Sequence, residues 1–266
     1  MAKQSFKNIF RLLDSVADDT PVEQSFLGDL KRSIEITTDK TDREPSKTYK
    51  PSSMTCIRNM YYQVTGRERD PQRSNYTLVG ICNSGTDIHE RVQKYVADMK
   101  NNDIDCEYIN VADFVRQRNL DYLEVVSQQG METKLYNKVL NISFLCDGII
   151  RYKGKYYILE LKTENSYKWQ SRNGVDPKHY SQGIAYSLMF HIDEVIFVYI
   201  NRDILDMKAF MFVPTDEMRN DLVNRILECE NFVSEGKTPP KPTNVPKSVC
   251  EYCSYRNSCR QEGDGV

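Results

Sequence analysis

Two carboxylates and a lysine near the middle of the chain have the spacing of a metal-dependent hydrolytic site. They lie in the segment FLCDGIIRYKGKYYILELKT, which contains Asp147, Glu160 and Lys162. A two-residue turn at Lys153 and Gly154 would form a β-hairpin that places Asp147 directly opposite Glu160. Opposed residues on antiparallel strands have Cβ atoms about 5 Å apart, so these carboxylates repel each other unless a cation lies between them.

This hairpin predicts Mg²⁺ or Mn²⁺ and hydrolytic chemistry. Both ions accept carboxylate oxygens at about 2.1 Å, which fits the gap between Asp147 and Glu160. Glu160 and Lys162 share one face of their strand, so Lys162 can orient a water and stabilise charge on a phosphate. The alternative is an exposed hairpin with a structural Glu–Lys pair. The apolar setting YYILELKT favours the metal site, because unpaired charges in a buried strand are costly.

Other side chains have types that suit such a site. His89 lies in GTDIHERVQKYV, and a neutral imidazole is a common metal ligand, although a solvated helical histidine is the alternative. Gln182 and Tyr186 are four residues apart on a predicted helix and share one face. Gln182 can hydrogen-bond a base or phosphate, whereas an ordinary helix pair is the alternative. Trp169, in the basic and aromatic loop ENSYKWQSRNG, can stack on unpaired bases, and a solvated surface is the alternative.

Four of the eight cysteines have the spacing of a metal site. CEYCSYRNSC arranges Cys250, Cys253 and Cys259 as C-x2-C-x5-C, and Cys56 is the candidate for a fourth ligand. Four thiolates bind either a structural zinc ion or an iron–sulfur cluster, and the spacing leaves both open. The remaining cysteines are expected to be buried free thiols: Cys82, Cys106, Cys146 and Cys229.

The order of the first set of motifs resembles the RecB-like PD-(D/E)XK nucleases. GTDIHERV resembles their histidine motif, CDGIIRYKGKYYILELKT their carboxylate–lysine hairpin, and QGIAY their Q-x-x-x-Y motif. The resemblance spans about residues 50–260. It implies a catalytic set of Asp147, Glu160 and Lys162. It implies that metal is held by His89, Asp147, Glu160 and the backbone carbonyl of Leu161. Gln182 and Tyr186 would support the site or contact DNA, and Glu132 is a candidate for reaching a second metal through water.

The cysteine pattern resembles the CRISPR-associated RecB-like exonucleases and the AddB nuclease domain. Cys56 belongs to the motif S-x-x-x-C-x-R-x-x-Y-Y, and the C-terminal motif C-x2-C-x5-C follows the nuclease motifs in the sequence. This resemblance implies a 4Fe–4S cluster on Cys56, Cys250, Cys253 and Cys259, with zinc as the alternative. The small size and the lack of helicase motifs favour the stand-alone CRISPR-associated or phage type.

Periodicity predicts helices followed by strands and then a mixed arrangement. The expected helices cover 5–17, 22–35, 54–64 with Ser53 as the cap, 76–99, 179–190 and 215–235. The expected strands cover 123–128, 132–139, 142–152, 155–163, 194–200 and 208–213, and a polar loop covers 164–178.

This order predicts an α/β (α+β) fold, and the resemblance implies a PD-(D/E)XK restriction-endonuclease-like core with a mixed central sheet. A helical lobe would be closed by the 4Fe–4S cluster. We expect one nuclease domain over 1–266. Residues 1–105 are its mostly helical part with Cys56 and His89. Residues 106–235 are the nuclease core, and residues 236–266 are an extended connector with the cluster-binding segment.

Composition limits the partners and the compartment. The 266 residues are 39% hydrophobic and 28% charged, as in a water-soluble globular protein. We find no apolar run long enough to span a membrane and no signal peptide, so we expect a cytoplasmic protein and no membrane partner. The net charge of −2 gives no overall positive field, so a DNA-binding surface must be local.

The expected function is a metal-dependent DNA exonuclease on single-stranded or linear DNA ends. The resemblance connects it with DNA recombination or repair, phage DNA processing or CRISPR adaptation. The alternative is an iron–sulfur DNA-binding or assembly module that acts with an integrase or a helicase partner, or as a homo-oligomer. A structural zinc protein with an incidental hairpin is the third reading.

Overall fold

The computed structural model describes residues 21–39, 47–71 and 75–263. The chain divides into two compact units, one of residues 1–42 and 73–80 and the other of residues 43–72 and 81–266. Both sheets and all the candidate site residues belong to the second unit.

The described part of the first unit contains α2 (Val22–Asp39) and the start of α4 (Tyr76–Asp98). The Tyr76 N–H donates a hydrogen bond of 3.2 Å to Glu35 Oε1 and joins the two helices. The helix predicted over 22–35 is confirmed and extends to Asp39. The helix predicted over 5–17 lies outside the described residues.

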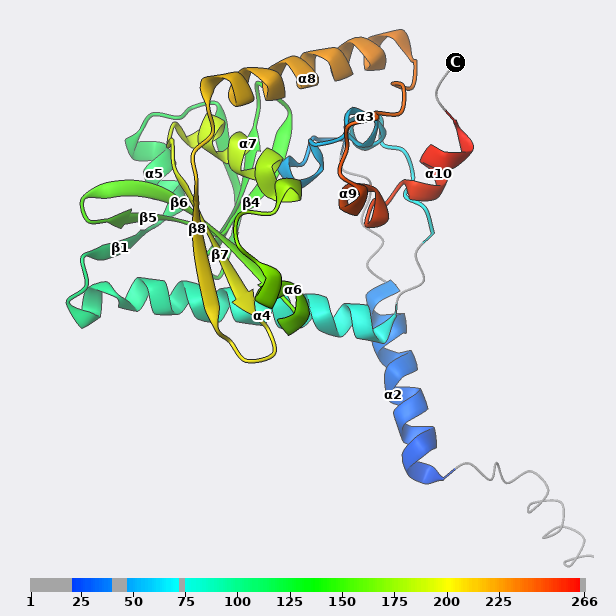
Figure 1. The fold of residues 1–266 in the computed structure, drawn as a ribbon, viewed down its shortest axis with the longest axis horizontal. Coiled ribbons are helices and arrows are strands. Elements are labelled where there is room, and N and C mark those ends of the chain that lie inside the picture. The colour runs from blue at the N-terminus through cyan, green and yellow to red at the C-terminus, as the bar shows by residue number, and fades with distance from the viewer. Residues whose placement is uncertain (1–20, 40–46, 72–74, 264–266) are drawn as a thin grey trace, which may run out of the picture. The chain divides into compact units, whose positions relative to one another are not determined.

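The larger sheet has five strands and mixed directions, as expected. Its order is β1 (Cys106–Ile109), β5 (Gly148–Tyr152), β6 (Lys155–Glu164), β7 (Val195–Asn201) and β8 (Met207–Phe212). Only the β6–β7 pair is parallel. A parallel pair needs a crossover connection, and the chain provides it with α6 (Ser166–Ser171) and α7 (Tyr180–Phe190) (Figure 1).

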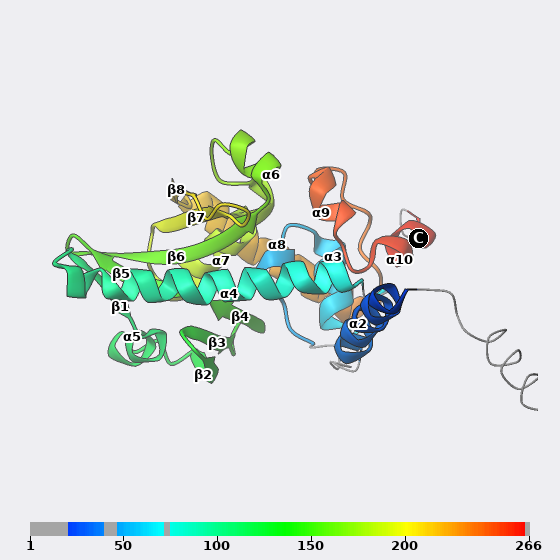
Figure 2. The ribbon, with the colours of Figure 1, turned by 90° about the horizontal axis from the view of Figure 1, so that it is seen from below.

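Helices cover both faces of this sheet. On one face, Ile88 and Val92 of α4 pack against Leu159 and Leu161 of β6, and Figure 2 shows α4 running along the strands. On the other face, α7 shares an apolar cluster with Ile158 and the apolar residues of β7, and α8 (Asp216–Glu235) packs against α7 and α3 (Ile57–Val64). Strand β6 is therefore covered on both sides, which explains its long apolar run.

The β5–β6 hairpin has the predicted turn and register. Lys153 and Gly154 both have positive φ, at 50° and 80°, as a two-residue type I′ turn requires. Gly148 pairs with Leu159, so the next residue before the strand, Asp147, lies beside Glu160. The prediction that these two carboxylates oppose each other is confirmed.

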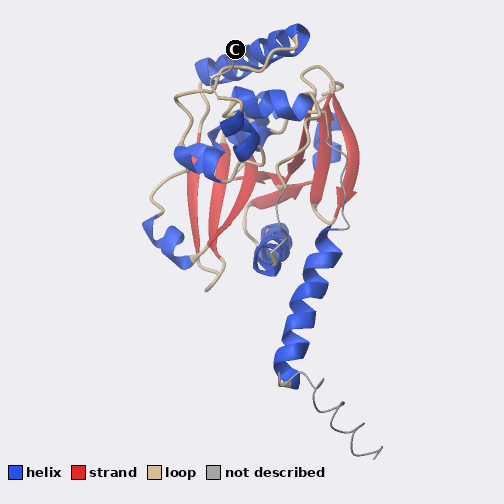
Figure 3. Ribbon diagram, turned by 90° about the vertical axis from the view of Figure 1, so that its right-hand side faces the viewer, coloured by secondary structure: helices blue, strands red, loops and turns tan. Residues whose placement is uncertain are grey.

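The predicted strand over 142–152 is wrong, because it is two strands in two different sheets. β4 (Ile142–Cys146) joins β2 (Leu123–Gln129) and β3 (Glu132–Asn137) in a three-stranded antiparallel sheet, and β5 begins at Gly148 (Figure 3). A Cβ on Gly148 would lie 2.7 Å from the Tyr108 ring, so only glycine allows this approach. Both halves have β-forming residues, so periodicity alone did not reveal the break at Asp147.

The cysteine-bearing segments form the remaining part of the second unit. Cys56 precedes α3 (Ile57–Val64), and the C-terminal cysteines lie on and between α9 (Lys247–Glu251) and α10 (Arg256–Gln261). The predicted start of α3 at Met54 with Ser53 as the cap is wrong. A 3₁₀ turn occupies Pro51–Ser53, and Cys56 is the N-cap.

Arg58 ties the C-terminal segment to α3. Its side chain is 0% exposed, and it donates to the carbonyl oxygens of Pro239 at 2.8 Å and Gly263 at 2.7 Å. Asp70 accepts hydrogen bonds from the backbone of Asn257 and Ser258 in α10. These bonds satisfy backbone groups that the short helix leaves unpaired.

Sequence patterns missed five short helices and strands: β1, α5 (Val111–Gln117), α6, α9 and α10. Each is four to seven residues long, too short for a clear helical or strand period. None of the helices in the described residues is long and apolar enough to cross a membrane.

Candidate active site and cysteine cavity

Asp147 and Glu160 lie side by side where β5 begins, and both are largely removed from water. They are 7% and 3% exposed, respectively. Asp147 Oδ2 accepts the Leu161 N–H at 2.7 Å. The N–H and C=O of one strand residue point to the same side, so the Leu161 carbonyl is also directed toward Asp147. Lys162 forms an ion pair with Glu160 on the shared strand face.

Gln182 holds the carboxylate and the lysine together. Its Oε1 accepts a hydrogen bond of 3.0 Å from Lys162, and its Nε2 donates to Glu160 Oε1 at 2.6 Å and to the Tyr186 hydroxyl at 2.8 Å. The Tyr186 hydroxyl donates to the Leu145 carbonyl at 2.6 Å. Tyr186 is buried, so this geometry gives it a supporting position. The spacing of four residues on α7 therefore brings both side chains to the hairpin.

α7 approaches the sheet closely because of the glycine next to Gln182. A Cβ on Gly183 would lie 2.8 Å from the ring of Phe212 and 3.2 Å from the ring of Phe197. Real Cβ atoms essentially never approach so closely, so a larger residue would push the helix outward. Such a movement would take Gln182 away from Lys162.

His89 and Glu132 complete the carboxylate cluster from two other elements. Ligand atoms of His89, Glu132 and Asp147 lie within 4.8 Å of one another, the one group of this kind among the described residues. His89 Nδ1 is 3.6 Å from Asp147 Oδ1. His89 comes from α4 and Glu132 from the start of β3. Helix α4 and the three-stranded sheet therefore each contribute one side chain to this cluster.

Burial and neighbouring charges shift the pKa values of the side chains in this cluster. Burial raises the pKa of Glu160 to about 7, against the lowering effect of Lys162. Burial and the charge of Asp147 raise the pKa of Glu132. Burial alone would lower the pKa of His89, but the hydrogen bond and charge of Asp147 outweigh it and raise that pKa. Glu160 Oε2 is buried and has no hydrogen-bond partner among the described residues. Glu160 is not a member of the group formed by His89, Glu132 and Asp147, but the charges of Asp147 and His89 act on it. A buried oxygen without a hydrogen bond next to these groups fits a divalent cation.

Two residues that sequence patterns did not identify position Asp147. Gln93 Nε2 donates to the Asp147 carbonyl at 2.7 Å, and the Tyr108 hydroxyl donates to the same oxygen at 2.6 Å. Gln93 lies one turn after His89 on α4, so the helix that carries one ligand also fixes another. That spacing of four residues was the only signal in the sequence that would have found Gln93.

The structure does not bring Trp169 to the carboxylate cluster. Its indole N–H donates to the Tyr199 carbonyl at 3.1 Å, and Lys208 lies 4.3 Å from the ring centre. Tyr167, in the same loop, is 84% exposed and is the open aromatic ring there. Arg172 fixes this loop to β6 through two hydrogen bonds to Glu164, of 2.6 and 3.1 Å. Loop 164–178 is therefore partly helical and anchored, unlike the expected polar loop.

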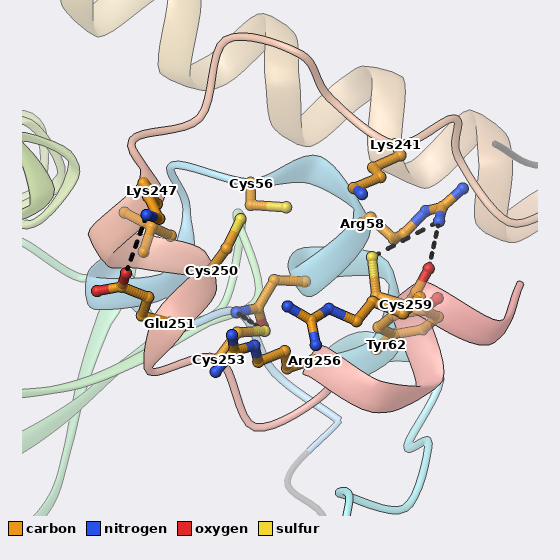
Figure 4. Close-up of a pocket in the computed structure, with 13 residues that line it drawn as sticks. Cys56, Arg58, Tyr62, Lys241, Lys247, Cys250, Glu251, Cys253, Arg256 and Cys259 are labelled. Atoms are coloured by element: carbon orange, nitrogen blue, oxygen red, sulfur yellow. Dashed lines mark hydrogen bonds and ion pairs between the residues drawn. The ribbon is translucent and has the colours of Figure 1, made fainter. Parts of the chain in front are cut away.

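The four predicted cluster cysteines surround one cavity. Cys56, Cys250, Cys253 and Cys259 line a space of about 170 Å³, and Figure 4 shows their side chains approaching it from α3, α9 and α10. One water molecule needs roughly 10–15 Å³, so the space is large enough for a group of several atoms. No three cysteine sulfurs in the described ranges lie within 4.8 Å of one another. Tetrahedral zinc, with bonds of about 2.3 Å, would need closer sulfurs.

Hydrogen bonds to sulfur favour thiolates at this cavity. Cys253 Sγ accepts from Asn59 Nδ2 and from the Tyr255 N–H, each at 3.5 Å. Cys259 Sγ accepts from Arg58 at 3.6 Å. Burial raises the pKa of Cys253 to about 11, so the metal-free thiol is protonated and metal binding would release its proton. The residues present therefore fit a polynuclear thiolate-bound group.

The other four cysteines differ in burial. Cys106, Cys146 and Cys229 are buried, as expected for free thiols. Cys82 is exposed on α4, so the expectation of a buried thiol there is wrong. Its neighbours on the helix, Leu78 and Ile81, are also exposed, so an apolar sequence setting did not imply burial.

No protein-family model matches the chain, and no curated protein matches it. The crystal structure of SSO0001 aligns with 91% of this chain and 97% of that chain, at 19% identity and a TM-score of 0.47. The alkaline exonuclease LHK-Exo from Laribacter hongkongensis aligns with 72% of this chain and 90% of its own, at 8% identity and a TM-score of 0.41. LHK-Exo in complex with dAMP has a TM-score of 0.37. These likenesses are distant, so the function is argued from the geometry of the site.

Proposed function

We propose that this chain is a metal-dependent deoxyribonuclease of the PD-(D/E)XK class that degrades single-stranded DNA or linear DNA ends. The observation that carries the proposal is the buried, unpartnered Oε2 of Glu160 beside Asp147, with Lys162 held at the same place by Gln182. Charged groups in this setting are costly to bury unless a cation and a reacting group use them.

Each side chain has a separate task in this proposal. Asp147, Glu160, His89 and the Leu161 carbonyl would hold Mg²⁺ or Mn²⁺, and Glu132, close to His89 and Asp147, would support a second ion. When bound, the metal would supply Lewis-acid polarisation of the phosphate and a more acidic water. An ammonium has three N–H donors, and Lys162 uses two of them on Glu160 and Gln182. The third is left to orient the attacking water or a phosphate oxygen.

Asp147 must keep its position for this chemistry. Its carboxylate is fixed by the Leu161 N–H, and its carbonyl is fixed by Gln93 and Tyr108. These bonds limit rotation of the Asp147 side chain, which lies between the two sheets. The site therefore needs little rearrangement when metal and substrate enter.

We propose that the cysteine cavity binds a 4Fe–4S cluster on Cys56, Cys250, Cys253 and Cys259. The cavity volume, the wide spacing of the sulfurs and the N–H donors to Cys253 and Cys259 support this group over zinc. The cluster would be structural, because it links the segment before α3 with the C-terminal segment. Iron and sulfide analysis of anaerobically purified protein tests this part, and one zinc per chain without iron would reject it.

The resemblance found in the sequence connects such an enzyme with DNA recombination and repair, phage DNA processing or CRISPR adaptation. An integrase, a helicase or another copy of the chain is the kind of partner expected there. The alternative function is an assembly module that does not itself cleave DNA. The DNA degradation assay described next also tests this alternative.

The test is degradation of end-labelled single-stranded DNA by anaerobically purified protein with Mg²⁺ or Mn²⁺, with and without EDTA. Lys162→Ala should lower the rate by about 10³ or more while leaving folding and visible absorbance intact. Lys153→Ala, in the hairpin turn, is the matched control and should cleave normally. Equal cleavage by wild type and Lys162→Ala would reject the assigned site. Well-folded wild type that does not cleave would favour the assembly module.

A further inference from the structure

A second cavity, of about 410 Å³, lies next to the cysteine cavity. The two share Asn59, Val249 and Cys253 as lining residues. Three of its lining residues are cationic, and none of the described residues that line it is a carboxylate. The chain as a whole has a net charge of −2. Positive charge concentrated in a cavity of an acidic chain attracts anions to that place.

The cationic residues are Lys50, Arg69 and Lys178, and they come from three distant segments of the sequence. Burial and the nearby charge of Lys168 lower the pKa of Lys178, although its Nζ also lies 3.7 Å from Asp176 Oδ2. Lys168 and Lys178 repel each other, and an anionic ligand at Lys178 would reduce that repulsion. The arrangement is therefore typical of a site for a polyanion.

His179 adds an uncharged polar ring to the same cavity. The Tyr199 hydroxyl accepts the Asp176 N–H at 2.9 Å and is hydrogen-bonded to His179 Nδ1, also at 2.9 Å. The other ring nitrogen, Nε2, can also form a hydrogen bond. Burial and the charges of Lys162 and Lys178 lower the pKa of His179 to about 2, so the ring stays neutral at working pH.

Tyr252 supplies an aromatic surface at the cavity. It lies between Cys250 and Cys253 and is 77% exposed. A positively charged groove with an exposed aromatic ring is the usual combination for an unpaired nucleic-acid strand, because phosphates contact the cations and bases stack. In a duplex the bases are paired and stacked within the double helix, so they are not available to stack on Tyr252.

The cavity is connected with the catalytic hairpin through the start of α7. His179 is the N-cap of this helix, and Gln182, which binds Lys162, follows three residues later. Ser181 Oγ donates to the Pro51 carbonyl at 2.8 Å and accepts from Thr55 at 3.0 Å. These bonds fix the segment that carries Lys50 to the helix that carries Gln182. A strand in the cavity would therefore lie next to the proposed site of cleavage.

We propose that this cavity is the groove that holds the unpaired DNA strand beside the scissile phosphate. Backbone phosphates contact Lys50, Arg69, Lys178 and His179, and a base stacks on Tyr252. The proposal rests on the proposed nuclease function. It also assigns the cysteine segment a second task, because that segment forms one wall of the groove.

The test measures binding without cleavage. Fluorescence anisotropy in EDTA gives the Kd of cluster-containing protein for a labelled single strand of about 16 nucleotides and for a blunt duplex. Lys178→Glu should weaken single-strand binding by about tenfold or more. It should also reduce the slope of log K against log salt by about 0.7, the loss of one phosphate contact. Lys153→Glu, at the hairpin turn, is the matched control and should bind as the wild type does.

Tyr252→Ala should weaken single-strand binding about tenfold and leave duplex binding unchanged, because only unpaired bases stack. If Lys178→Glu does not retain the visible absorbance of the wild type, the milder Lys178→Gln replaces it. Unchanged affinity and salt slope in the lysine variant, or equal loss of duplex and single strand in Tyr252→Ala, would overturn the groove. Cleavage with Mn²⁺ is measured separately. If the wild type cleaves DNA and both variants bind DNA as the wild type does, the groove is rejected and the nuclease is not. If the variants lose single-strand binding as expected but the wild type cleaves no DNA, the groove is supported and the nuclease is rejected.

Discussion

Glu160 should destabilise the metal-free protein, and Glu160→Gln should therefore raise its stability. The carboxyl has a pKa of about 7 in the folded chain because burial disfavours its charge, against an ordinary value of 4.5. That difference corresponds to about 3 kcal/mol of cost for the charged form at pH 8. The cost is absent below the ordinary pKa, grows as pH rises and is complete above pH 7. Glutamine has nearly the same shape and carries no charge at any pH.

The assay is thermal unfolding of both proteins in EDTA, under anaerobic conditions, between pH 5 and pH 8. At pH 5 the two Tm values should nearly coincide. At pH 8 Glu160→Gln should melt up to 6–12 °C higher, since 1 kcal/mol shifts Tm by about 2–4 °C in a chain of this size. The loss of the ion pair with Lys162 reduces this gain, so the increase with pH is the decisive quantity.

Divalent metal should reverse the order of stability. On the proposed assignment, wild type binds Mn²⁺ in the folded state only, and Mn²⁺ at 100 times its Kd should add about 2.7 kcal/mol of stability. Glu160→Gln lacks the ligand and should gain little. A Tm difference in EDTA that does not grow with pH would refute the burial argument. A variant that Mn²⁺ stabilises as strongly as wild type would refute the ligand assignment.

Three further substitutions test other parts of the structure. His89→Ala removes an imidazole beside Asp147, and the Mn²⁺ concentration for half-maximal cleavage should rise by about 10–100-fold; an unchanged titration would exclude His89 as a ligand. Gln182→Ala releases Lys162 and Glu160, so kcat should fall by about tenfold or more while single-strand Kd stays constant; a changed Kd with normal kcat would instead make it a DNA contact. Arg58→Ala breaks buried bonds to Pro239 and Gly263, so iron content should fall sharply, whereas exposed Cys82→Ser should keep it; equal iron in both would separate Arg58 from the cysteine cavity.

The parts of the site that sequence predicted are those fixed by local geometry. The register between Asp147 and Glu160 follows from a two-residue turn, and the shared face of Gln182 and Tyr186 follows from the helical period. The mixed sheet followed from the order of strand-like and helical segments. The register and the shared helix face required only neighbours within one hairpin or one helix.

Other features depend on contacts between distant segments and left no local pattern. Gln93 and Tyr108 hold Asp147 through a backbone carbonyl, a group that every residue has. At the break between β4 and β5, Gly148 lies against the Tyr108 ring of another strand. The partly buried Trp169 is held by contacts with β7 and Lys208. A sequence that shows its residue types does not show which of them the fold brings together.

The cysteine cavity also has a consequence for the order in which the chain acquires its properties during synthesis. The hydrolytic residues Asp147, Glu160 and Lys162 lie in one hairpin, whereas Cys56 and Cys250 are separated by about 200 residues. The ribosome releases Cys250, Cys253 and Cys259 after the hairpin, and folding of local elements precedes such distant contacts. On the proposed assignments, a growing chain has its hydrolytic hairpin before it has Tyr252 and the cavity wall that contacts a DNA strand. Attack on DNA would then be delayed until the segment with these three cysteines has been synthesised and has packed against α3.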